Sequence, residues 1–208
     1  MFIDVEQNTD EWFALRLGKV TSSNFSKIMA NLGKDFGSPA IEYAQKVALE
    51  YVTGNRDESA SYKNGYMERG HELEPVAVEL YERETFYSVT NGGFNQEESK
   101  EPILLGDSPD GNVGEDGCIE IKSVIPNTQW KRIKKGGIDL AYKWQIHGHI
   151  WLGDKQWCDF ISYCPEMPEN KQLHIFRVER DDIIISLMDE RLDEFKGVVM
   201  EHVELLLN

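Results

Sequence analysis

The run Ser108-Pro109-Asp110, followed after a short loop by Glu120-Ile121-Lys122, is the stretch that decides the expected fold. If residues 117–124 form a strand, its period of two places Glu120 and Lys122 on one face and the isoleucines beside them on the other. A carboxylate and an amine then stand side by side above a hydrophobic sheet. The pattern therefore predicts a sheet that carries a charged site.

The side chains of this stretch suit one kind of chemistry. Asp110 and Glu120 offer carboxylates to a hard cation such as Mg2+, which takes its further ligands from water and phosphate oxygens. Lys122 can orient or deprotonate an attacking water, so the pattern indicates hydrolysis of a phosphodiester. The alternative is a turn aspartate with a surface ion pair on an exposed strand. Asp107, Asp110 and Asn112 lack the EF-hand spacing, which argues against a calcium loop.

Bulk composition indicates an ordinary soluble protein. The 208 residues, of which 40% are hydrophobic, fit one domain spanning 1–208. The cysteines at 118, 158 and 164 form no close pair, which favours a reducing compartment and argues against disulfides. We see neither a signal-like amino terminus nor an apolar run of membrane-spanning length. A cytoplasmic location without a membrane partner is therefore expected.

The net charge of −15 argues against a nucleic-acid function, because DNA affinity depends on Lys and Arg displacing counterions from phosphates. The charge is unevenly distributed, however, since acids dominate 179–204 while basic residues gather just downstream of the predicted site. These basic residues are Lys131, Arg132, Lys134, Lys135 and Lys143. An acidic outer face and a basic inner face would reconcile this composition with DNA binding.

Helix signals recur along the chain. Expected helices begin at Thr9, 21–23, Ser38, Pro126, Asp139 and Asp181, and another spans 66–84. Within the expected helix 66–84, Pro75 predicts a kink or a junction between two helices. Polar residues at 55–63 predict an exposed loop.

Short strands and turns are expected between residues 86 and 124, where they would form an antiparallel meander. The predicted strands of the whole chain are 87–89, 102–105, 118–124, 156–163 and 173–178. Apolar residues from Asp181 onward repeat close to a helical period, which predicts an amphipathic terminal helix. The expected fold is therefore α/β (α+β), a mixed central sheet flanked by helices.

Four sequence motifs occur in order and span most of the chain. They are 12–18 (WFALRLG) with 20–23 (VTSS), 70–74 (GHELE), 108–111 (SPDG) with 119–122 (IEIK), and 141–145 (AYKWQ) leading to Trp151. In these motifs the chain resembles the phage lambda exonuclease and YqaJ-like viral recombinase nucleases. That family is a branch of the PD-(D/E)xK superfamily, and the resemblance implies its restriction-endonuclease-like fold.

The resemblance implies specific roles at the charged site. Asp110, Glu120 and the Ile121 backbone carbonyl would hold Mg2+, as two ions for which Mn2+ can substitute. Lys122 would handle the nucleophilic water, and Glu74 would support a metal, directly or indirectly, or a water. Two divalent ions can stabilise both the attacking and the leaving oxygen of an in-line displacement. Without the resemblance, Glu74 would be expected to be a solvated acid on the surface of a helix.

The resemblance also implies a pocket for the 5' phosphate of a DNA end. Arg16 would bind it with the hydroxyls of Ser23 and Ser108, and guanidinium suits this through its planar bidentate donors. Gln145 would join both this pocket and the catalytic cluster. The residues alone leave alternatives open: Ser22 or Ser23 as a plain N-cap, Gln145 as a helix-surface amide, and Arg16 as an exposed helix-end arginine.

The implied activity is Mg2+-dependent 5'-to-3' exonuclease action on linear double-stranded DNA. It would release mononucleotides and leave a 3' single-stranded tail. The resemblance further implies a homotrimer ring around the DNA, a single-strand annealing protein as partner, and a phage or prophage origin in a bacterial cell. An endonuclease of the same superfamily and a non-catalytic DNA-binding module with this fold remain as alternatives.

The histidines and tryptophans carry weaker signals. His147 and His149 cannot share a helical face at their spacing, so the histidines are expected at surface or packing positions. The tryptophans at 130, 144, 151 and 157 are expected in the core or at a subunit interface.

Overall fold

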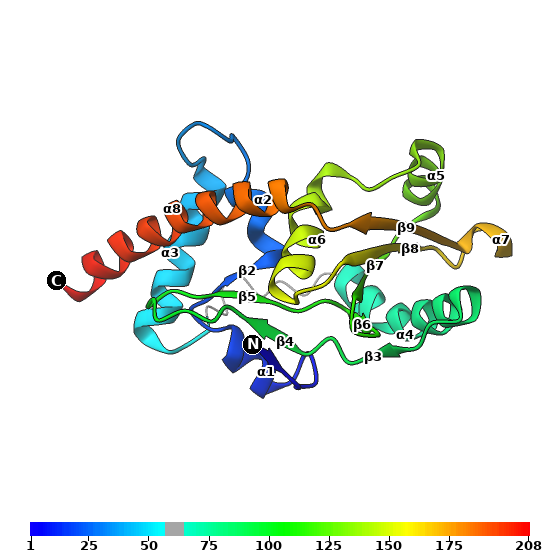
Figure 1. Cartoon of the computed structure of the whole chain (residues 1–208), viewed down its shortest axis with the longest axis horizontal. Coiled ribbons are helices and arrows are strands. Elements are labelled where there is room, and N and C mark those ends of the chain that lie inside the picture. The colour runs from blue at the N-terminus through cyan, green and yellow to red at the C-terminus, as the bar shows by residue number, and fades with distance from the viewer. Residues whose placement is uncertain (57–64) are drawn as a thin grey trace.

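Two β-sheets lie at the centre of the molecule, with helices around them (Figure 1). The computed structural model describes the backbone of residues 1–56 and 65–208 and the side chains of 1–56 and 68–208. The predicted loop at 55–63 therefore lies mostly outside the described residues. Within the described part, no helix is long and apolar enough to cross a membrane.

The larger sheet contains the strand predicted to carry the site. Its strands are, in spatial order, β3 (Val89–Thr90), β6 (Gly111–Val113), β7 (Gly117–Ser123), β8 (Trp157–Tyr163) and β9 (Leu173–Glu179). β7 and β8 run parallel, whereas the other neighbours are antiparallel. The predicted mixed sheet is therefore confirmed.

A smaller sheet lies beside it and corrects the predicted meander. Its order is β1 (Phe2–Ile3), β4 (Phe94–Gln96), β5 (Leu105–Asp107) and β2 (Val20–Thr21). β5 pairs in parallel with β2, from far earlier in the chain, and antiparallel with β4. The strands between residues 86 and 124 are thus divided between two sheets rather than forming one meander, because β4 and β5 pair with β1 and β2 of the amino-terminal segment.

Most predicted helices are present. The helices are α1 (Asp10–Arg16), the 3₁₀ helix η1 (Ser22–Asn24), α2 (Phe25–Ile28), α3 (Ser38–Thr53), α4 (Gly65–Thr85), α5 (Pro126–Lys135), α6 (Leu140–Leu152), α7 (Glu169–Gln172) and α8 (Asp182–Leu207). Pro75 lies inside α4, which continues through it, so the predicted junction between two helices is wrong. The short α7 was not expected from the sequence.

Strand β7 is buried on both faces. Ile119 and Ile121 pack with Tyr81 of α4, while Cys118 on the opposite face packs with Ile146 of α6. The predicted alternation is confirmed, but both faces are covered, as is usual for parallel strands between helices. The charged residues of β7 therefore lie inside a covered sheet rather than on an open surface.

The terminal helix α8 packs along α3, and the two helices share a hydrophobic core with α2. Asp181 caps its start by accepting hydrogen bonds from the backbone N–H groups of Ile183 and Ile184 at 3.0 and 3.2 Å. Its buried residues include Leu192 and Phe195. The predicted amphipathic helix is confirmed, and Figure 1 shows it running from the centre of the molecule to the carboxyl terminus.

Gly148 allows α6 to approach the amino-terminal segment closely. A Cβ atom at this position would lie 2.9 Å from Cβ of Ser22 and 3.0 Å from the ring of Phe25, both of which are buried. Only a hydrogen atom fits there. Helix α6 is therefore held directly against η1 and α2.

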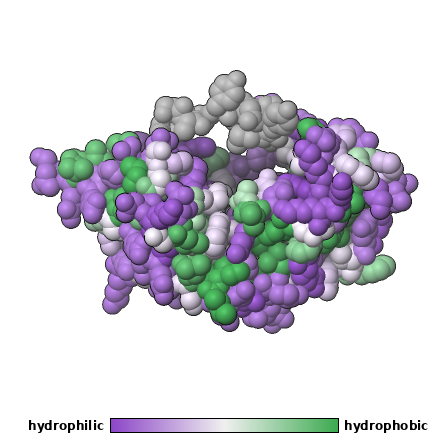
Figure 2. Space-filling view, turned by 90° about the horizontal axis from the view of Figure 1, so that it is seen from above, coloured by the Kyte–Doolittle hydropathy of each residue, from purple (hydrophilic) through white to green (hydrophobic). Residues whose placement is uncertain are grey.

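The face of the molecule seen in Figure 2 is largely hydrophilic. On the face shown in Figure 2, purple hydrophilic residues surround scattered green hydrophobic patches. This distribution agrees with a chain in which 28% of residues are charged.

Candidate active site

Asp110 directly precedes strand β6 and lies beside β7. Pairing between the two strands reaches Gly111 and Ile119. One residue earlier, the Asp110 backbone N–H donates to the Ile119 carbonyl at 3.0 Å, and Oδ2 of Asp110 accepts from the Ile121 N–H at 2.6 Å. The Asp110 side chain thus accepts the backbone hydrogen bond that a neighbouring strand would otherwise accept, and this contact fixes it beside β7.

The Ile121 carbonyl lies on this same edge. The N–H and C=O groups of one strand residue point to the same side, and the Ile121 N–H already points at Asp110. The Ile121 carbonyl therefore points to the side of β7 on which Asp110 lies.

Glu120 is almost fully buried, with 1% of its surface exposed, and its Oε1 atom meets two donors. Lys122 Nζ forms an ion pair with Oε1, and Gln145 Nε2, from α6, donates to the same atom at 2.8 Å. Gln145 is thus part of the cluster and not a free surface amide. The predicted side-by-side placement of Glu120 and Lys122 is observed.

Charge in this cluster is unevenly compensated. Burial alone would raise the pKa of Glu120, but Lys122 and His149 outweigh it and lower this pKa to about 2. For Asp110, burial and the nearby negative charge of Glu120 raise the pKa well above its ordinary value, despite opposition from Lys122. One carboxylate is therefore held ionised, while its neighbour lacks the positive charge it would need.

Lys122 and Glu74 complete the charge distribution. Burial disfavours the Lys122 ammonium, but Glu120 and Asp110 prevail and raise its pKa, so that it carries its proton. Glu74, half-buried on α4, has a pKa raised first by burial and also by the negative charge of Glu120. The structure thus places Glu74 within electrostatic reach of the cluster.

This donor set fits a hard divalent cation. Asp110 and Glu120 supply carboxylate oxygens, the Ile121 carbonyl supplies a third oxygen, and a cation would relieve the repulsion that raises the pKa of Asp110. Among the described side chains of 1–56 and 68–208, no three His, Cys, Asp or Glu form a ligand group by themselves. An incomplete protein shell of oxygens is what Mg2+ takes, because it retains waters and substrate oxygens.

His149 is a functional candidate that the sequence reasoning missed. It is 1% exposed, its Nδ1 lies 2.6 Å from Oδ1 of Asp107, and its Nε2 lies 2.9 Å from Oε2 of Glu120. Of the two expected positions, surface and packing, the surface is therefore excluded for His149. The available signal was the spacing of Gln145 and His149, which at i and i+4 share one face of α6.

Arg16 and Ser108 lie together, as the motifs implied. Arg16 Nη1 donates to Ser108 Oγ at 3.3 Å, Trp12 Nε1 donates to the same oxygen at 2.9 Å, and the guanidinium lies 4.2 Å from the Trp12 ring centroid. Burial lowers the pKa of Arg16 from its ordinary value. Arg56 stacks on the neighbouring ring of Phe13 and adds a second positive charge that the sequence reasoning did not identify.

The two candidate serines after β2 take different positions. Ser22 is buried and donates its hydroxyl hydrogen to Oδ1 of Asp107. Ser23 is exposed, with its hydroxyl 3.4 Å from Oγ1 of Thr21. Of the two, Ser23 is thus the one with a hydroxyl open to solvent.

The basic cluster downstream of the site is only partly on the surface. Lys131, Lys134 and Lys135 are exposed. Arg132 is 3% exposed, bonds Asp139 and Ser162, and so cannot belong to a basic inner face, because its guanidinium is already engaged. Trp130 is 58% exposed, so of its two expected positions, the core and a subunit interface, the core is excluded.

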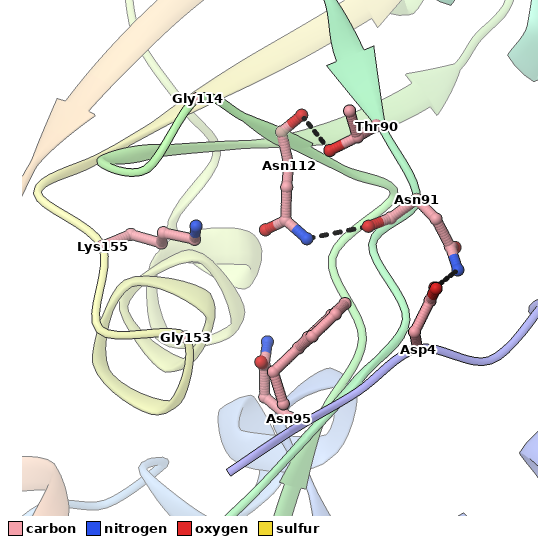
Figure 3. Close-up of a pocket in the computed structure, with 9 residues that line it drawn as sticks. Asp4, Thr90, Asn91, Asn95, Asn112, Gly114, Gly153 and Lys155 are labelled. Atoms are coloured by element: carbon pink, nitrogen blue, oxygen red, sulfur yellow. Dashed lines mark hydrogen bonds between the residues drawn. The ribbon is translucent and has the colours of Figure 1, made fainter.

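A separate cavity of about 460 Å³ lies at the junction of the two sheets (Figure 3). Amide groups dominate its wall: Asn112 Nδ2 donates to the Asn91 carbonyl at 2.8 Å, and Asn91 Nδ2 donates to Asp4 at 2.7 Å. Asn95, also in the wall, lies 3.4 Å from Oδ2 of Asp107. The cavity therefore adjoins the far side of the Asp107–His149 pair.

Comparison with known proteins agrees with this geometry. The model of the YqaJ-like viral recombinase domain matches residues 11–156. Among solved structures, the alkaline exonuclease LHK-Exo from Laribacter hongkongensis is 34% identical with a TM-score of 0.85, over 95% of this chain and 96% of that one. The same values hold for LHK-Exo in complex with dAMP.

A more distant structure shares the fold. The phage related exonuclease from Haemophilus somnus 129PT is 18% identical with a TM-score of 0.65, over 93% of this chain and 96% of that one. Among curated proteins, none matches this sequence. The family match covers most of the chain and includes every residue of the Asp110–Glu120–Lys122 site. This chain therefore belongs to the YqaJ-like viral recombinase family.

Proposed function

We propose that this protein is a Mg2+-dependent exonuclease that degrades linear double-stranded DNA from the 5' end. The observation that carries the proposal is the convergence of Asp110, Glu120 and Lys122 at the end of β6 and the edge of β7. Family membership and the 34% identity to the alkaline exonuclease LHK-Exo support a nuclease of the phage recombination type.

The residues of the cluster divide the chemistry among them. Asp110, Glu120 and the Ile121 carbonyl would hold Mg2+, which supplies positive charge to stabilise the attacking and leaving oxygens. Lys122, whose pKa is raised by Glu120 and Asp110, would orient the attacking water from its place beside Glu120. Glu74, on α4, would complete the acidic side as a support for a metal-bound or attacking water.

End selection rests on a different group of residues. Arg16, stacked on Trp12 and bonded to Ser108, presents a guanidinium suited to a 5' phosphate. Ser108 directly precedes the Pro109-Asp110 turn, so the phosphate pocket and the cleavage site are adjacent in the chain. Ser23 and Gln145 would add a hydroxyl and an amide donor.

The product would be mononucleotides, and the remaining strand would form a 3' single-stranded tail. The complex of LHK-Exo with dAMP supports a mononucleotide product. The net charge of −15 calls for a concentrated basic surface, and Lys131, Lys134 and Lys135 could provide one on the inside of a homotrimer ring. A single-strand annealing protein would take over the tail.

One assay tests the activity and its polarity. Purified protein with Mg2+ or Mn2+ is given linear duplex labelled at the 5' or the 3' end, and covalently closed circular DNA of the same sequence. We expect release of the 5' label first, acid-soluble mononucleotides from linear DNA, an intact circle, and no activity in EDTA. Cutting of the circle at a comparable rate would indicate an endonuclease, and absence of any digestion would indicate a non-catalytic module; either result overturns the proposal.

A further inference from the structure

The side chain of His149 is held between two buried carboxylates. Its Nδ1 lies 2.6 Å from Asp107 Oδ1, and its Nε2 lies 2.9 Å from Glu120 Oε2. All three residues are at most 1% exposed. Such an arrangement has a fixed geometry, because neither carboxylate can turn away without leaving a buried polar group unpaired.

Each ring nitrogen of His149 faces the oxygen of a different carboxylate, Nδ1 that of Asp107 and Nε2 that of Glu120. Because Asp107 holds one edge of the ring, the other edge is fixed in direction toward Glu120. A hydrogen-bond partner placed behind a metal-ligating side chain in this way orients that side chain.

The two oxygens of Glu120 are thereby given different surroundings. Oε2 faces His149, whereas Oε1 faces Lys122 and Gln145. We propose that His149, backed by Asp107, is a positioning residue that orients Glu120 so that Oε1 alone is presented to the metal ion. This inference rests on the proposed function, since it assigns a role within the same site.

Asp107 is itself fixed from two further directions. Ser22 donates its hydroxyl to Oδ1, and Asn95 lies 3.4 Å from Oδ2. Asp107 also directly precedes Ser108, the residue that Arg16 contacts. The orientation of Glu120 is therefore connected, through His149 and Asp107, to the segment proposed to receive the DNA end.

A buried ion pair on the neighbouring strand offers a matched control. Asp159 of β8 is 1% exposed and accepts hydrogen bonds from Arg177 at 2.8 and 2.7 Å. It stands in register with Ile119, on the opposite face from Glu120. Loss of Arg177 disturbs a comparable pair without touching the proposed metal site.

The experiment measures divalent-ion binding without DNA. Calorimetric titration with Mg2+ and with Ca2+ compares the parent with His149→Gln, Asp107→Asn and Arg177→Gln, and melting in EDTA reports folding. We expect His149→Gln to weaken ion binding by about 10- to 100-fold. Asp107→Asn should weaken it less, and Arg177→Gln should leave it unchanged while lowering the melting temperature. For His149→Gln, the Mg2+ concentration giving half-maximal digestion should rise in parallel, with KM for DNA retained.

The outcomes separate this inference from the proposed function. If His149→Gln and Asp107→Asn bind ions like the parent, or if Arg177→Gln loses as much affinity as they do, the positioning role is overturned while the nuclease remains. If the parent binds ions but digests no DNA, the proposed function fails, and the order of affinities still decides the role of His149. Should His149→Gln not fold, the Asp107→Asn result decides alone.

Discussion

Glu120 and Asp159 are two buried acids on adjacent parallel strands, yet their surroundings differ in kind. Both are 1% exposed. Asp159 is satisfied by Arg177 and by Tyr81, whose hydroxyl donates to Oδ2 at 2.7 Å. Glu120 is paired with Lys122 and His149, but it has a second carboxylate as a neighbour, Asp110, whose pKa is raised by burial and by Glu120 itself. Asp159 therefore finds its partners within the fold, whereas the repulsion at Asp110 is not compensated by its neighbours, which is the arrangement expected of the proposed cation site.

The largest effect is expected when a charge is removed from the cluster of Asp110, Glu120 and Lys122, here called the open cluster. Lys122→Ala should lower the rate of digestion by at least about 100-fold, because the donor that orients the attacking water is lost. The measurement is the initial rate of acid-soluble nucleotide release at saturating Mg2+. Activity equal to that of the parent would remove Lys122 from the chemistry.

Arg16→Ala should separate end selection from cleavage. A charge-assisted contact to phosphate contributes about 1.5–3 kcal/mol, so the preference for 5'-phosphorylated over 5'-hydroxyl ends should fall by about 10- to 100-fold. The rate on hydroxyl ends should change much less. Parallel digestion of both substrates checks this, and an equal loss on the two ends would contradict the pocket.

Arg177→Gln tests the buried ion pair between Asp159 and Arg177. One partner of a buried acid is removed, although Arg177 is 35% exposed on its side chain and Tyr81 still donates to Asp159. We expect a loss of about 1–3 kcal/mol in the free energy of unfolding. The rate of digestion should stay close to that of the parent. Denaturant titration and the nuclease assay give both values, and a variant that is stable but inactive would break the comparison.

Tyr81→Phe should have the smallest effect. It removes one hydrogen bond to Asp159 and leaves the Arg177 pair and the packing of the ring in place. The expected loss in the free energy of unfolding is about 1 kcal/mol. A loss as large as that of Arg177→Gln would mean that the tyrosine, and not the ion pair, closes this side of the sheet.

The open cluster was largely predictable because its main residues are neighbours along the chain. Asp110, Glu120 and Lys122 belong to one hairpin, whose alternation and turn residues are visible in the sequence. Gln145 came from family resemblance, and its contact with Glu120 is observed. The helices were predictable for a similar reason, since capping residues and apolar periods are local signals.

The rest depends on contacts between distant segments. The hydrogen bond between Asp107 and His149 joins residues that are brought together by the packing of α6 against β5, and no local sequence pattern predicts it. The two-sheet arrangement arises similarly, because β5 takes its parallel partner β2 from the amino-terminal segment. Arg132 looked like a surface charge within a basic run, but its aromatic and acidic partners come from other elements.

Gly148 sets how closely helix α6 can approach the amino-terminal segment. Helix α6 brings Gln145 and His149 to Glu120, and a Cβ at position 148 would collide with Ser22 and Phe25. A methyl group at this position would push the helix outward and move Gln145 and His149 away from Glu120 together. Gly148→Ala is thus a way to loosen the site without altering a chemical group in it.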